Sequence, residues 1–144
     1  GRALSIDIDA FLGCRRVMLA LVRFSLERGA FAAVIGPMES IARKKQEKLD
    51  LLTEMLYTLL EDLLHLWQGR GETLIHDDIR DELTDLAGRV CFAWLEQAAG
   101  GLAQLDQLAR RNIQKQVALE AWALGLRQIS ARERLATAEP ALAR

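Results

Sequence analysis

The residues of this sequence best suited to metal chemistry are two histidines and the carboxylates that follow the second of them. His65 lies near the end of a leucine-rich segment, and His76 is followed directly by Asp77 and Asp78. Histidine nitrogens and carboxylate oxygens are common metal ligands, and an adjacent His-Asp pair suits a helical phosphohydrolase. Such a site needs further inward-facing ligands, and the chain has no third histidine. We therefore prefer to interpret these residues as a surface histidine and a helix cap.

Other patterns that would support catalysis are absent from the sequence. The Gly69-Arg70-Gly71 segment is too short for a phosphate-binding loop, and no strand is expected before it. Cys14 and Cys91 lie in helical patterns typical of buried, reduced thiols, and neither has a neighbouring histidine that would make it a nucleophile. We therefore expect no catalytic residue, no cofactor and no resident metal.

A basic cluster formed by Arg43, Lys44, Lys45 and Lys48 is the only candidate for contact with DNA. The cluster has no interleaved aromatic residues, and acidic residues follow it closely, which is typical of a solvated helix face. The whole chain has a net charge of -1, so it carries no global electrostatic signal for nucleic acid. Contact of the cluster with DNA stays open as the alternative.

Composition predicts an all-α fold with a single bundle of five or six helices. Hydrophobic residues make up 51% of the 144 positions, and leucine and alanine fill most of the apolar ones. These two residues favour helices, whereas strands prefer β-branched and aromatic residues. Proline occurs only at Pro37 and Pro140. No apolar run approaches the length of a membrane helix, so we expect a soluble protein.

The strongest periodic signal is a long helix between Met38 and Trp67. Its leucines recur at alternating spacings of three and four residues, which predicts a seam for shallow helix packing: Leu49, Leu52, Leu56, Leu59, Leu63 and Leu66. Further apolar residues, among them Leu51 and Leu64, widen this seam. We therefore predict a helix that is covered on more than one side and lies at the centre of the bundle.

Glycine and capping residues suggest the limits of the other helices. Ser5 or Asp7 can cap the start of the first helix, Asp7 being the better candidate, and Gly29 is a candidate C-cap for the same helix. Gly36-Pro37 interrupts the helical pattern, because proline lacks a backbone donor. Gly100-Gly101 lies within a later helical pattern and suggests a kink or a close contact with another helix. Periodicity is lost after Ile129, which predicts a frayed end.

Four segments, read in order, resemble the delta prime subunits of the bacterial DNA polymerase III clamp loader. Gly1-Arg2-Ala3-Leu4 is similar to the end of that family's lid region, and RKKQEKLDLLTEMLYTLLEDLLHL resembles its basic and then leucine-rich central collar helix. The next two signatures of this family resemble the segments HDDIRDELTDLAGRV and ARRNIQKQVALEAWALGL. The second of these matches through Arg111, Asn112, Ala118, Leu119 and Glu120. The likeness covers about residues 1–129.

The resemblance implies that this chain is a collar domain, the C-terminal part of such a protein. In this family the collar domains form a ring that holds the loader together while it places the sliding clamp on primed DNA. The implied limits are the end of the lid at 1–4, a helical collar domain at 5–129 and a poorly structured tail at 130–144. The implied partners are the gamma/tau and delta subunits in the bacterial cytoplasm, with no membrane and with DNA contacted only weakly or indirectly.

The same resemblance points to faces of the central and last helices as contacts with neighbouring subunits. The residues that we expect at this interface are Trp94, Asn112, Leu119, Trp122 and Leu126. Tryptophan is enriched at interface hot spots but is also a large core residue, so core packing is the alternative for the two tryptophans. An apolar face left without its partner also favours homodimerisation of the isolated domain.

Three other functions stay open at this point. The nearest is the collar domain of the gamma/tau subunit, which shares the fold. A small metal-dependent hydrolase would use His65, His76 and Asp77, and a DNA-binding module would use the basic cluster around Arg43.

Overall fold

The computed structural model describes residues 2–34, 36–37, 46–110 and 115–142, and this part of the chain is helical with no strand. Its main elements are α1 (Arg2–Ser25), α3 (Gln46–Trp67), the 3-10 helix η1 (Asp77–Ile79), α4 (Arg80–Ala87), α5 (Phe92–Arg110) and α6 (Lys115–Leu142). The prediction of an all-α helical bundle is confirmed. Within the described residues, no helix combines the length and apolar character needed to cross a bilayer.

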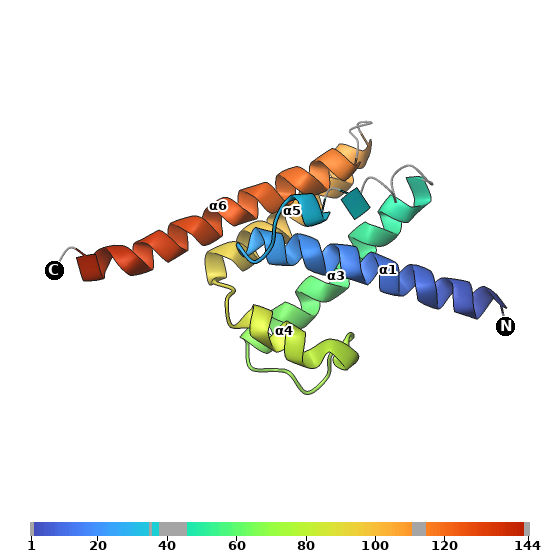
Figure 1. Cartoon of the computed structure of the whole chain (residues 1–144), viewed down its shortest axis with the longest axis horizontal. Coiled ribbons are helices and arrows are strands. Elements are labelled where there is room, and N and C mark those ends of the chain that lie inside the picture. Colours follow the sequence, from blue (N-terminus) through green and yellow to red (C-terminus); the bar gives the residue numbers. More distant parts are fainter. Residues whose placement is uncertain (1, 35, 38–45, 111–114, 143–144) are drawn as a thin grey trace.

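Helix α3 is the central element of the bundle, as its leucine pattern predicted. It packs against α1, α4 and α5 (Figure 1). Leu52, Leu56, Leu59 and Leu63 are completely buried, with exposed fractions of 0%. Burial of a leucine side chain stabilises a fold by about 1.5–3 kcal/mol, so this stripe is a major source of stability.

A glycine in α5 allows α6 to approach closely. A Cβ atom on Gly101 would lie 2.6 Å from Cδ1 of Trp122, a distance that side chains do not tolerate, whereas Gly100 has no such neighbour. The Trp122 indole Nε1 donates to the Ala98 carbonyl oxygen at 3.1 Å. Trp94 meets Trp122 edge-on, with ring centroids 6.5 Å apart. The predicted close helix contact is therefore confirmed at Gly101.

Helix α1 begins at Arg2, so the prediction of Asp7 as its N-cap was wrong, and it ends before the glycine that the sequence suggested as its C-cap. Glu27 has a left-handed φ of 62°, and its N–H donates to the Phe24 carbonyl at 3.1 Å. The Arg28 N–H donates to the Arg23 carbonyl at 2.7 Å. Together these bonds form a Schellman motif with Glu27 at the left-handed position, so the prediction of Gly29 was wrong. A non-glycine residue in this conformation is strained and must be held by its surroundings.

Helix α6 supplies the contacts that hold the end of α1. Arg127 Nη1 donates to the Phe24 carbonyl at 2.7 Å, and its guanidinium carbon lies 4.5 Å from the centroid of the Phe24 ring. Ser130 Oγ donates to the Ser25 carbonyl at 2.8 Å. A cation at a helix C-terminus complements the partial negative charge of its last carbonyls. Side chains of α6 therefore satisfy carbonyl groups at the C-terminus of α1.

The last helix continues further than the sequence indicated. Residues 130–142 are helical, whereas loss of periodicity predicted a poorly structured tail over 130–144. Strong helix formers dominate this segment, and Arg134 Nε donates to Glu27 Oε2 at 2.9 Å, which explains part of the difference. The end of α6 and the start of α1 project from the bundle at opposite ends (Figure 1).

A buried carboxylate on α3 fixes the loop that follows this helix. Asp62 is completely buried. Its Oδ1 accepts the Ile75 backbone N–H and its Oδ2 accepts the His76 backbone N–H, both at 2.8 Å. Two consecutive amides therefore use both oxygens of one carboxylate, and these bonds set the position at which η1 begins.

The His76 side chain lies inside the protein and not on its surface, with an exposed fraction of 1%. Its Nε2 is 2.8 Å from Thr58 Oγ1, whose hydroxyl donates to the Met55 carbonyl. Nε2 must therefore carry the proton and donate to Thr58. Nδ1 faces Arg15 Nη1 at 3.4 Å and can only accept from it. This arrangement requires a neutral imidazole, and the interpretation of His76 as a surface residue was wrong.

Arg15 extends the buried network from α1 to η1. Its Nη1 and Nη2 donate to Asp78 Oδ1 and Oδ2 at 2.9 and 2.6 Å, a bidentate pair. The Phe11 ring stacks on the His76 ring with centroids 5.8 Å apart, and the Arg15 guanidinium carbon lies over the Phe11 ring, 5.4 Å from its centroid. Helix α1 is thus joined to the loop after α3 by both charge and ring contacts.

Burial lowers the pKa of His76 below its ordinary value of 6.5, and the positive charge of Arg15 acts in the same direction. Asp62 and Asp78 oppose this shift but do not reverse it. Because the folded protein binds this proton less readily than the unfolded chain, acidification favours unfolding. The stabilising contribution is complete above pH 6.5 and is lost as the pH falls from there toward the folded-state pKa.

We expect Asp62→Ala to lower the free energy of unfolding by about 3 kcal/mol, because the buried His76 amide and the partly buried Ile75 amide lose their acceptor, and each unsatisfied group costs roughly 1–3 kcal/mol. Urea denaturation measures this change. The matched control is Glu61→Ala at the exposed neighbouring position, for which we expect a change within about 0.5 kcal/mol. Equal losses for the two variants would contradict the role of Asp62.

We also expect the free energy of unfolding to fall as the pH is lowered from about 7.5 toward 5.5, because the pKa of His76 is lower in the folded protein than in the unfolded chain; the slope for one proton is at most about 1.4 kcal/mol per pH unit. His76→Gln should remove this component from denaturation curves measured across the pH range. His65→Gln, at the only other histidine, should retain it. The assignment to His76 would be wrong if His65→Gln removed the pH-dependent component and His76→Gln retained it.

Candidate protein interface

An open apolar groove of about 520 Å³ runs between α3 and α5. Its apolar walls are formed by Tyr57, Leu60, Leu64, Phe92, Leu95, Ala98, Ala99 and Leu102. We call this feature the α3–α5 groove. Most of its lining is apolar, which is unusual for an open surface and typical of a site that another protein covers.

The groove follows from the spacing of residues on the two helices. Tyr57 and Leu64 lie two turns apart on the side of α3 that faces away from its buried leucine stripe. Ala98 and Ala99 on α5 are small, so they leave space between the helices where larger side chains would meet. The groove therefore has large exposed apolar side chains on α3 and small side chains on α5 between which space remains.

Phe92 in the groove lining contacts a second aromatic side chain, Trp67. The Trp67 and Phe92 rings are tilted against each other with centroids 6.1 Å apart. Both are exposed, Trp67 by 40% and Phe92 by 63%. Burial of such aromatic side chains against a partner gives interfaces much of their binding energy.

Carboxylates lie on both sides of the groove. Glu61 projects from α3 and Glu96 from α5, and both are exposed. An apolar floor between acidic edges is complementary to an apolar ridge flanked by basic residues.

The interface residues expected from the sequence lie elsewhere. Trp94, Leu119 and Leu126 have exposed fractions of 0%, and Trp122 is 8% exposed. This chain itself covers these side chains, and their contact with a neighbouring protein stays a prediction. They form the core between α5 and α6, and Asn112 lies outside the described residues.

The basic cluster is also outside what the structure describes. Arg43, Lys44 and Lys45 fall in the segment 38–45, and the side chain of Lys48 is likewise not described although its backbone belongs to α3. Contact of these residues with DNA stays a prediction.

The residues of the alternative metal site do not converge. His76 is engaged with Thr58 and Arg15, and Asp77 pairs with Arg80 at 2.6 Å. Across the described ranges, no three His, Cys, Asp or Glu side chains are grouped to hold a metal. The geometry therefore gives no support to a hydrolase based on His65, His76 and Asp77.

The sequence did contain a signal for the groove. Apolar residues on α3 exceed those needed for one buried seam, and we interpreted this excess as coverage by other parts of the same chain. In the structure, Leu51, Leu64 and Trp67 remain exposed by 47%, 38% and 40%. Of these three residues, Leu64 lines the groove, whereas Leu51 and Trp67 are exposed outside its lining.

Comparison with known proteins identifies a family. No curated protein and no solved structure shows significant similarity to the chain. Residues 16–128, however, match the family described as DNA polymerase III, delta subunit, C terminal. This match begins in α1, ends in α6 and includes the whole α3–α5 groove. The chain therefore belongs to this family, which comprises C-terminal domains of the DNA polymerase III delta type.

Proposed function

We propose that this chain is the collar domain of a clamp-loader delta prime subunit and holds the loader together during DNA replication in the bacterial cytoplasm. The family match over residues 16–128 is the main support, and it bears on the coarser part of the proposal, a clamp-loader subunit domain of the DNA polymerase III delta type. The order of the four motifs that resemble delta prime subunits supports this assignment over gamma/tau, whose collar domain is the alternative.

The α3–α5 groove is the surface that we assign to contact with a neighbouring subunit. An amphipathic helix can lay its apolar side chains into such a groove, as in many helix-in-groove interfaces. Glu61 and Glu96 would then face basic residues beside that apolar stripe. We expect the partner to be a collar helix of the gamma/tau or delta subunit.

This role requires binding and no chemistry. The buried titratable groups of the network, Arg15, Asp62 and His76, are engaged with one another or with backbone amides. Their arrangement positions helices, so we assign this domain a structural role and no catalytic one.

We expect the domain to assemble with purified gamma and delta subunits. Size-exclusion chromatography measures this assembly, with full-length delta prime as the positive control. The domain should co-elute with the other subunits and should compete with full-length delta prime for them. Failure to co-elute where the full-length protein does would overturn the proposal, and competition with gamma instead would favour the gamma/tau alternative.

We expect Phe92→Glu and Leu64→Glu to weaken this assembly at least tenfold, because each places a charge in an apolar contact, and losing about 1.4 kcal/mol of binding energy is a tenfold change. Ile75→Glu is the matched control, since this side chain is 56% exposed but lies outside the groove. Circular dichroism should show that all three variants remain folded. Assembly that survives the groove variants but not the control would place the interface elsewhere.

A further inference from the structure

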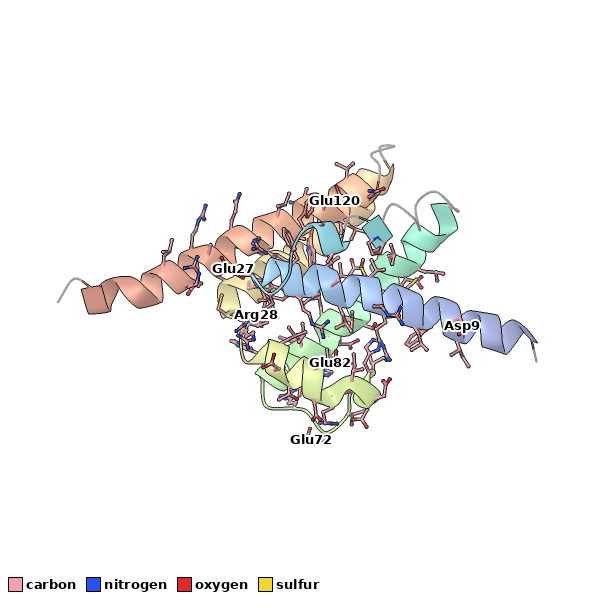
Figure 2. The ribbon with its side chains drawn as sticks, viewed as in Figure 1. Asp9, Glu27, Arg28, Glu72, Glu82 and Glu120 are labelled. Atoms are coloured by element: carbon pink, nitrogen blue, oxygen red, sulfur yellow. The ribbon has the colours of Figure 1, made fainter. Side chains whose placement is uncertain are left out.

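A second hollow, of about 590 Å³, lies where the end of α1, the segment between α4 and α5, and α6 meet. Four arginines line it: Arg28, Arg89, Arg127 and Arg134. We call it the arginine hollow. Figure 2 shows Glu27 and Arg28 at the end of α1, close to α6 and to the start of α5.

Two of the four arginines already have structural partners. Arg127 caps the end of α1 through the Phe24 carbonyl, and Arg134 pairs with Glu27. The hydrogen bond from Arg134 lowers the pKa of the Glu27 carboxyl, so this carboxylate stays charged and paired. These two arginines form the fixed wall of the hollow.

The other two arginines retain donors for a ligand. Arg28 is exposed, and within the described part of the chain its side chain has no hydrogen bond or ion pair with another residue. Arg89 reaches Asp85 only through a long contact of 3.4 Å between Nε and Oδ2, which leaves both of its terminal nitrogens for other acceptors. The donors available to a ligand therefore come mainly from Arg28 and Arg89.

The backbone holds Arg28 in this position at a cost. Glu27 adopts its left-handed conformation although glycine would do so without strain, and Gly69 fills the equivalent position at the end of α3 with a φ of 78°. Strained residues persist where the surroundings fix them, and they occur preferentially at binding sites. Here the strain sets the direction in which the chain leaves α1, and with it the position of Arg28.

We propose that the arginine hollow binds an acidic peptide segment of a partner protein. A carboxylate matches the planar fork of a guanidinium and can accept two parallel hydrogen bonds from Arg28 or Arg89. The four arginines outnumber the two carboxylates of the lining, Glu27 and Glu133, by two charges. Leu26 and Cys91 add an apolar part to the wall, which suits aliphatic side chains between the acidic ones.

Charge and shape favour a peptide over nucleic acid. The two glutamates on the wall would repel a continuous phosphate backbone, whereas separate carboxylates can be placed between them. Among the described residues that line the hollow, none is aromatic. The Phe24 ring under the Arg127 guanidinium is itself buried, so the lining offers no platform on which a base could stack.

Fluorescence anisotropy of the whole chain with a fluorescein-labelled peptide of alternating glutamate and leucine tests the proposal. We expect saturable binding that weakens with salt, and at least a fivefold loss of affinity in Arg28→Gln and in Arg89→Gln. Arg28→Lys keeps the positive charge but lacks the planar guanidinium with its two parallel donors, so we expect an intermediate loss of peptide affinity. Arg16→Gln removes an exposed charge outside the hollow and should bind like the parent chain.

Three outcomes would overturn the proposal. The first is absence of saturable binding at low salt. The second is an equal loss of affinity in Arg16→Gln and Arg28→Gln, which would indicate attraction to the general surface charge. The third is tighter binding of a labelled oligothymidylate that is lost in Arg28→Gln and Arg89→Gln, which would make the hollow a phosphate site. Unfolding curves of each variant confirm that losses do not come from misfolding.

Discussion

The buried Asp62 carboxylate accepts hydrogen bonds from two consecutive backbone amides. The contacts around this carboxylate depend on its position in the core. A buried charge is costly unless hydrogen bonds satisfy it, and here the Ile75 and His76 amides do so. With the backbone of His76 fixed, its ring reaches Thr58 on α3 and Arg15 on α1. Arg15 in turn holds Asp78 at the start of η1. One carboxylate therefore determines how α1, α3 and the loop before α4 fit together.

Helix α3 carries two apolar faces, one buried in the core and one exposed. Its leucine stripe forms the core with α1, α4 and α5, while Tyr57 and Leu64 leave an apolar face open beside α5. A helix that is central to its own domain thus also has an exposed apolar face. Because the core and the buried polar network hold α3 rigidly, a partner that docks on this face meets a preformed groove, which lowers the entropic cost of binding.

The fold was largely predictable from the sequence, because local patterns determine it. Leucine spacing identified α3 as the central helix, and the glycine pair indicated the close contact at Gly101. The ends of α1 and α6 were not predictable, since Glu27 is held by Arg134 and that contact joins residues far apart in the chain. The burial of His76 depends in the same way on Asp62 and Arg15, which no local pattern connects.

The candidate interface was harder to predict than the fold. Trp94 and Trp122 suit cores and interfaces alike, and only the packing of α5 on α6 places them in the core of this chain. Surfaces that depend on the relative placement of two helices become visible only in three dimensions.

Hydrogen–deuterium exchange of the domain alone and in the assembled loader tests the central claim most directly, since it measures protection along the whole chain without mutation. The account predicts slower exchange on assembly in residues 57–64 and 92–102, which contain the lining of the α3–α5 groove, with no change in the part of α1 around Met18 and Leu21, whose side chains are completely buried. Increased protection confined to other surfaces, with the groove unchanged, would contradict the assignment of the groove as the interface with a neighbouring subunit.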